Sequence, residues 1–198
     1  MTSLERSNLS KLITQMQDTI LPLQAESLSY QIAKNSSLLP EKKIMLPHYL
    51  AWYSGATKAD KTDIANMLPS VCMNIIDYFG NPRKLTLREV SKIVQEIVQK
   101  VQGNNILFLY NFNQNILPYM GVETHMVSSL DEIIFSLRAG NPSLAVFKDG
   151  SEVILRGMDS NYCYVIYGNC QQEQIAIKDF QSAVVALWVC SSLKKQAC

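Results

Sequence analysis

The hydrophobic pattern of this 198-residue chain changes its period after about two-thirds of the sequence. Before about residue 140, apolar residues recur three and four positions apart, which predicts amphipathic helices. From residue 144 on, they form short runs separated by turn residues, which predicts antiparallel strands. Helices followed by an antiparallel sheet are the order typical of the α+β fold class.

Pro69 gives the clearest local restriction on one of these helices. A proline is tolerated at the first helical position but costs about 3 kcal/mol in a helix interior. We therefore predict a helix over residues 69–79 that starts or is kinked at Pro69. We expect its apolar face to pack across the strands that contain Val146, Ile154 and Val165.

Two further helices carry capping signals. Thr86 and Glu89 form a capping box ahead of an apolar stripe that runs to residue 101. Ser129 is predicted to cap another helix, which Gly140 closes. The segment between them, residues 106–119, has a mixed pattern, and whether residues 107–110 begin a strand or a helix stays open.

The last third of the chain contains five predicted strands. Asp149 and Gly150 tolerate a positive φ and predict a hairpin turn between the first two strands. The strands are expected at residues 144–147, 153–155, 162–167, 175–177 and 184–189.

The first 59 residues are predicted to form a helical N-terminal extension, and residues 60–198 the α+β domain. An amphipathic stripe runs from Leu9 to Ile20, and the small, polar residues 54–60 mark the boundary. A single helix of this length is marginal in water unless its apolar stripe is buried. We therefore expect the extension to pack on the domain or to bind a partner subunit.

Composition excludes several classes of function. The chain has 18 basic and 17 acidic residues, a formal net charge of +1, so we expect no nucleic-acid partner. No run approaches the roughly 20 apolar residues of a membrane span, and the first residues lack the pattern of a signal peptide. We expect no membrane insertion and a cytoplasmic location.

The cysteines do not suggest a metal site or a cofactor. They form an odd set without Cys-x-x-Cys spacing, and the chain has only two histidines. Cys72, Cys163 and Cys190 lie in apolar runs, and in a reducing cytosol we expect them to be small core residues. The set is Cys72, Cys163, Cys170, Cys190 and Cys198.

Three short segments occur in a characteristic order: Tyr78-Phe79-Gly80, then Ala139-Gly140-Asn141-Pro142, then Val153-Ile154-Leu155-Arg156-Gly157. They resemble the double-glycine (bacteriocin-processing) peptidase domains of bacterial ABC exporters. That family has Cys-Gly-Pro, a helix ending Tyr-Tyr-Gly, Leu-x-x-Gly-x-Pro, and a strand His-Trp-Val-Val-Leu-x-Gly. The resemblance implies a papain-like fold over about residues 60–190, with a helical half packed on an antiparallel sheet.

The same resemblance implies that the catalytic residues are absent. Met67 falls at the position of the nucleophile, and Ser151 at that of the general base. A thioether can neither ionise nor attack, and a hydroxyl does not shuttle protons as imidazole does. Asn66 matches the oxyanion-hole Gln only if the register shifts. Asn169 matches the third family residue, but with no base to orient we expect it to be a turn residue.

A rival catalytic set uses Cys72, which lies six residues after Asn66, the spacing of Gln and Cys in papain-like enzymes. Its base would be His125 or His48. The protein would then be an active cysteine peptidase or acyltransferase of the effector type. The other interpretation makes Cys72 a core thiol and His125 a surface or capping residue.

We expect a non-catalytic protein-binding module or adaptor on a papain-like scaffold, in bacterial protein secretion. Exporter domains of this family without the cysteine hold unfolded secretion substrates, and a groove without its nucleophile can accept an extended peptide by edge pairing. The expected partner is a secretion-machinery subunit or an extended peptide. The enzyme that uses Cys72 is the alternative, and an unrelated α+β subunit of a larger assembly is a third.

Overall fold

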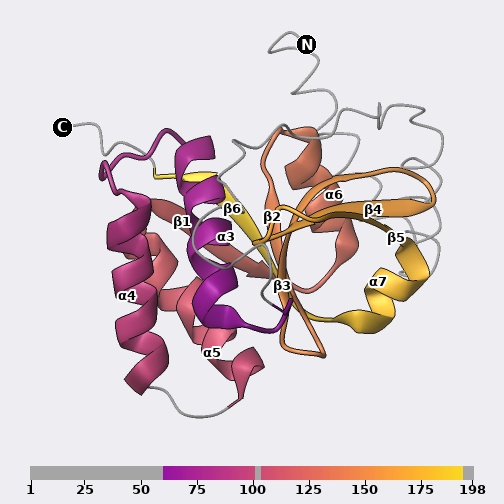
Figure 1. The fold of residues 1–198 in the computed structure, drawn as a ribbon. Helices are drawn as coiled ribbons and strands as arrows, with labels where there is room; N and C mark the ends of the chain where they lie inside the picture. The colour runs from indigo at the N-terminus through magenta and orange to yellow at the C-terminus, as the bar shows by residue number, and fades with distance from the viewer. Residues whose placement is uncertain (1–59, 101–103, 194–198) are drawn as a thin grey trace, which may run out of the picture. The chain divides into compact units, whose positions relative to one another are not determined.

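The computed structural model describes residues 60–100 and 104–193, and these residues form an α+β domain. They contain five α-helices and an open, six-stranded antiparallel sheet (Figure 1). The predicted class is therefore confirmed. The helical extension expected at residues 1–59 and its boundary with the domain lie outside the described residues.

The elements follow the helix-then-strand order of the sequence pattern. They are α3 (Ile64–Tyr78), α4 (Leu87–Lys100), α5 (Asn105–Asn111), the π-helical turn η2 (Phe112–Ile116), the 3-10 turn η3 (Leu117–Met120), β1 (Val122–Val127), α6 (Leu130–Arg138), β2 (Ser143–Phe147), β3 (Glu152–Met158), β4 (Tyr162–Tyr167), β5 (Gln172–Ala176), α7 (Ile177–Ala183) and β6 (Val184–Ser192). The strand order in the sheet is β1-β6-β2-β3-β4-β5. Every neighbouring pair is antiparallel.

Helix α3 begins earlier than predicted. Asp63 caps it by accepting a hydrogen bond from the Asn66 backbone N–H at 3.3 Å, and Pro69 lies inside the helix. Every residue from Met67 to Ile76 is buried. The start expected at Pro69 is therefore wrong, because the cap and this buried segment outweigh the one backbone donor that the proline removes.

Helix α4 and its capping box are confirmed. The Thr86 N–H donates to the Glu89 carboxylate at 2.7 Å, and the Glu89 N–H donates to the Thr86 hydroxyl at 3.3 Å. Ser129 caps α6 as predicted. The open question at residues 106–119 is answered by α5, η2 and η3, which are all helical.

All five predicted strands are present, but two elements were missed. Strand β1 lies at one edge of the sheet, and only its two end residues are buried. Its sequence, Val-Glu-Thr-His-Met-Val, therefore lacks a clear alternation. The fourth strand was expected at residues 175–177, but β5 covers Gln172–Ala176 and so lies earlier in the sequence. Helix α7, which was not predicted, begins directly after it at Ile177.

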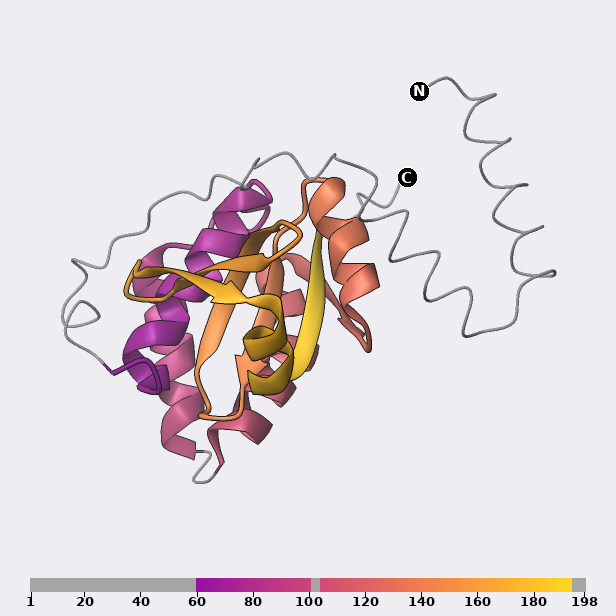
Figure 2. The same cartoon turned by 90° about the vertical axis from the view of Figure 1, so that its right-hand side faces the viewer.

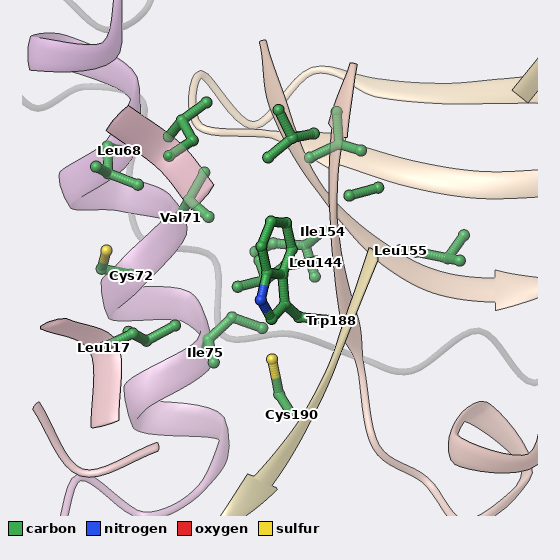
Figure 3. Packing of buried hydrophobic residues seen from close by; sticks show 14 of the residues in the cluster. Leu68, Val71, Cys72, Ile75, Leu117, Leu144, Ile154, Leu155, Trp188 and Cys190 are labelled. Atoms are coloured by element: carbon green, nitrogen blue, oxygen red, sulfur yellow. The ribbon is translucent and has the colours of Figure 1, made fainter. Parts of the chain in front are cut away.

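The sheet separates two helical layers. Helices α3, α4 and α5 lie on one side, and α6 packs against β2, β3 and β6 from the other (Figure 2). In Figure 3, Val71 and Ile75 of α3 face Ile154 and Trp188 of the sheet. The predicted packing of this helix on the strand of Ile154 is thus confirmed.

The Val165 side chain itself does not lie under α3, although the prediction concerned only the strand that contains it. Val165 is paired with Leu155, and residues paired directly across an antiparallel ladder share a face. Leu155 points away from α3 in Figure 3, whereas its neighbour Ile154 points toward α3. Val165 therefore belongs to the opposite face of the sheet.

One hydrogen bond joins two of the sequence segments that carry the family resemblance. The Tyr78 hydroxyl at the end of α3 donates to the Gly140 carbonyl just beyond α6. Gly140 has a φ of +85°, which ends α6 in a left-handed conformation.

Within the described ranges, every helix is too short or too polar to cross a lipid bilayer.

Candidate functional site

The structure brings the position of Met67 close to the hairpin turn that contains Ser151. Met67 lies in the first turn of α3 and is buried. It borders a small cavity together with Gly150 and Glu152, the two neighbours of Ser151. The full lining is Lys61, Ile64, Met67, Leu68, Val71, Leu109, Gly150 and Glu152. The two segments expected to flank a catalytic centre therefore meet.

The space between these segments is very small. The cavity has a volume of about 10 Å3, which is room for about one water molecule. Its lining is mostly apolar. Among the described residues, this place offers no room for a peptide side chain or a cofactor.

Gly168 closes the same region from the turn between β4 and β5. A Cβ atom built on Gly168 would lie 2.2 Å from the Met67 carbonyl oxygen and 2.9 Å from the Met67 Cα. Real Cβ atoms do not approach backbone that closely. The backbones of this turn and of α3 are thus in direct contact, and only glycine fits between them.

The polar residues proposed around Met67 are all engaged locally. The buried Ser151 hydroxyl donates to the Asp149 carboxylate at 2.6 Å, and the Ser151 N–H donates to the same oxygen at 2.8 Å. The Asn169 side chain accepts from the Gln171 N–H at 2.9 Å, so Asn169 is the turn residue expected. The Asn66 amide donates to the Asp63 carboxylate at 2.8 Å and belongs to the helix cap.

Cys72 lies in the core on α3 and is only 1% exposed. Burial raises the pKa of its thiol well above the ordinary value, with smaller contributions from Glu152 and Cys190. Since the thiolate is the reactive form, Cys72 in this position is neutral and out of reach of substrate.

Cys72 and His125 are not brought together. His125 is exposed on the edge strand β1, where it pairs with Val189. This exposed position agrees with the interpretation of His125 as a surface residue. Side chains alternate along a strand, so His125 and Val189 lie on the opposite face from Trp188, which faces α3 in Figure 3. His48 lies outside the described residues.

Glu152, the most unusual polar group of the site, was not predicted from the sequence. Its side chain is 6% exposed, and one carboxylate oxygen accepts a hydrogen bond from the amide of Asn113. Burial raises the pKa of Glu152 to about 7, although the Asn113 hydrogen bond acts in the opposite direction. The sequence feature that could have indicated a buried acid is the position of Glu152 at the start of an apolar run, just before Val153.

Lys61 borders the cavity, but its charge is engaged with other groups. Its ammonium lies 2.8 Å from the Glu173 carboxylate and 4.0 Å from the centre of the Tyr167 ring. The hydrogen bond from Lys61 is the main cause that lowers the pKa of Glu173. Lys61 therefore ties the segment before α3 to strands β4 and β5.

The described ranges contain no group of three His, Cys, Asp or Glu side chains that could hold a metal ion. Comparison of the sequence with family models and with curated proteins gives no match. The likeness to double-glycine peptidase domains therefore rests on the short segments quoted above. Chemically, the Met67 region presents no thiolate and no free imidazole among the described residues.

Proposed function

We propose that the protein is a non-catalytic binding module or adaptor, built on a papain-like scaffold and acting in bacterial protein secretion. The direct backbone contact between Gly168 and Met67 carries this proposal, because it fills the place where a papain-like enzyme has its nucleophile. The burial of Cys72 supports it as well. The partner is an extended polypeptide segment of a secreted protein or of a secretion subunit.

Binding by strand addition suits an open sheet. The sheet ends in β1 on one side and β5 on the other, and edge strands can accept an extended peptide through backbone hydrogen bonds. Because the region around Met67 has no room for a peptide, we expect an extended peptide to bind at one of these edge strands. A near-neutral net charge of +1 fits recognition through backbone and apolar groups rather than through charge.

The experiment compares binding and turnover in the full chain. Wild type and Cys72→Ala are used for affinity purification with mass spectrometry, and both are incubated with peptide, ubiquitin-like and acyl substrates. We expect the same partner with both proteins and no turnover with either. Turnover that disappears in a folded Cys72→Ala variant would overturn the proposal in favour of the enzyme.

Two matched surface variants locate the binding edge. Gln174→Lys on β5 and His125→Lys on β1 each place a lysine at an exposed edge position, which opposes strand pairing without entering the core. We expect one variant to lose the partner and the other to keep it. Retention by both variants would show that neither edge is the binding surface.

A further inference from the structure

A buried pair of side chains, Glu152 and Asn113, links the sheet to the π-helical turn η2. Glu152 is the first residue of β3, and Asn113 is the second residue of η2. They are 6% and 1% exposed, and the Asn113 amide donates to one oxygen of Glu152. Glu152 borders the small cavity together with Met67 and Leu68 of α3.

Each member of the pair has one polar atom without a hydrogen-bond partner among the described residues. These atoms are the second carboxylate oxygen of Glu152, Oε2, and the amide oxygen of Asn113, Oδ1. Both are oxygens that accept hydrogen bonds, and leaving such an atom buried and unpaired destabilises the folded state. What this pair lacks is therefore a hydrogen-bond donor between two acceptors.

Water is a poor source of that donor. The cavity beside Glu152 has a volume of about 10 Å3, and six of its eight lining residues contribute apolar side chains or a glycine. A buried water needs two to four polar partners. Among the described residues, only Glu152 and Lys61 bring polar side chains to this lining, and the Lys61 ammonium is bound to Glu173. Asn113 does not border the cavity, so a water there would not reach both unpaired oxygens.

We propose that Glu152 and Asn113 form a buried proton-binding site, in which a proton on Glu152 Oε2 is donated to Asn113 Oδ1. The carboxylic acid and the amide then exchange two hydrogen bonds, and both unpaired oxygens are satisfied by one proton taken from solvent. The site is independent of the proposed binding function.

The surroundings favour the neutral acid. The groups that face Glu152 are the Cys72 thiol on α3, the Cys190 thiol on β6 and the Lys61 ammonium ahead of α3. Burial raises the pKa of both thiols, so neither brings a charge. Lys61 is the one cation among the described residues that line the cavity, and Glu173 neutralises it.

The backbone of η2 holds Asn113 in place for this role. The Thr124 hydroxyl of β1 donates to the Asn113 carbonyl at 2.7 Å. The Leu117 N–H donates to the Phe112 carbonyl, as the π-helical spacing requires. Single π-helical turns are frequent at functional sites. Protonation of Glu152 therefore fastens η2 and β1 to the start of β3.

Because the folded protein binds this proton, its free energy of unfolding should fall as the pH rises. The pKa of Glu152 rises from its ordinary value of 4.5 to about 7 in the folded protein. The stabilisation is then fully present below pH 4.5 and is lost as the pH rises through 7. From pH 5 to pH 7, this one group should raise the unfolding equilibrium constant by about 40-fold.

The test measures urea unfolding of the full chain from pH 5 to 7.5 for wild type and Glu152→Gln. Glutamine can make both hydrogen bonds to Asn113 without titrating, so we expect Glu152→Gln to lack the 40-fold change. The matched control is Glu96→Gln, which removes an exposed carboxylate from α4 and should keep the wild-type dependence. Equal pH dependence in wild type and Glu152→Gln would overturn the proposal.

A second measurement uses wild type alone, in case Glu152→Gln does not fold. Carbon-13 NMR of the glutamate carboxyl groups reports each titration separately. We expect one glutamate to titrate near pH 7. If every glutamate of the folded protein titrates below pH 5.5, the proton-binding site is absent.

Discussion

The contact between Gly168 and Met67 makes Gly168→Ala the most informative substitution for the fold. The added Cβ would lie 2.2 Å from the Met67 carbonyl oxygen, whereas ordinary contact begins at 3.4 Å. One of the two backbones must therefore move by about 1.2 Å. Overpacking in a well-packed interior costs about 1–3 kcal/mol, and a clash of backbone with backbone belongs at the upper end.

We expect Gly168→Ala to lower the free energy of unfolding by about 3 kcal/mol. For an m-value of about 2 kcal/mol/M, this lowers the urea midpoint by about 1.5 M. Gly80→Ala is the matched control: its Cβ meets no atom within 4 Å, but its φ of +83° costs about 1 kcal/mol. Adding Met67→Ala should not rescue Gly168→Ala, because the clash is with backbone. A loss below about 0.5 kcal/mol, or a rescue by Met67→Ala, would refute the close contact.

Two further substitutions test the packing of α3. Tyr78→Phe removes the donor to the Gly140 carbonyl and should lower the free energy of unfolding by about 1 kcal/mol in urea titrations, with an unchanged m-value. An unchanged midpoint would show that this hydrogen bond does not hold α3 to α6. Cys72→Ser places a hydroxyl in an apolar core and should lower the thermal midpoint, with a cost of about 1–2 kcal/mol, whereas a variant as stable as wild type would place residue 72 nearer the surface.

The sequence predicted those elements whose local signals agree with their tertiary environment. The capping box at Thr86 and Glu89, the cap at Ser129 and the turn at Asp149-Gly150 are all local patterns, and each is present in the structure. Helix α3 was placed too late because a proline carries a strong local penalty. The burial that offsets this penalty is a tertiary effect, which spacing alone does not show.

The candidate site was predicted only in part, for a similar reason. The sequence placed Met67 and Ser151 at one centre, and the structure does bring Met67 next to the neighbours of Ser151. The sequence did not predict the pair of Glu152 and Asn113. These residues are 39 positions apart and come into contact only in the folded chain. Strand β1 was missed because an edge strand exposes polar residues on both faces.

The proposal that Cys72 is an unreactive core thiol in a non-catalytic protein has a direct test. Folded protein is treated with iodoacetamide near pH 7.5, and the modification of each cysteine is followed by mass spectrometry of its peptide. The account predicts that Cys72 reacts only as fast as the domain unfolds, well after the half-buried Cys170. Rapid modification of Cys72 in the folded protein would contradict it and would indicate an accessible thiolate.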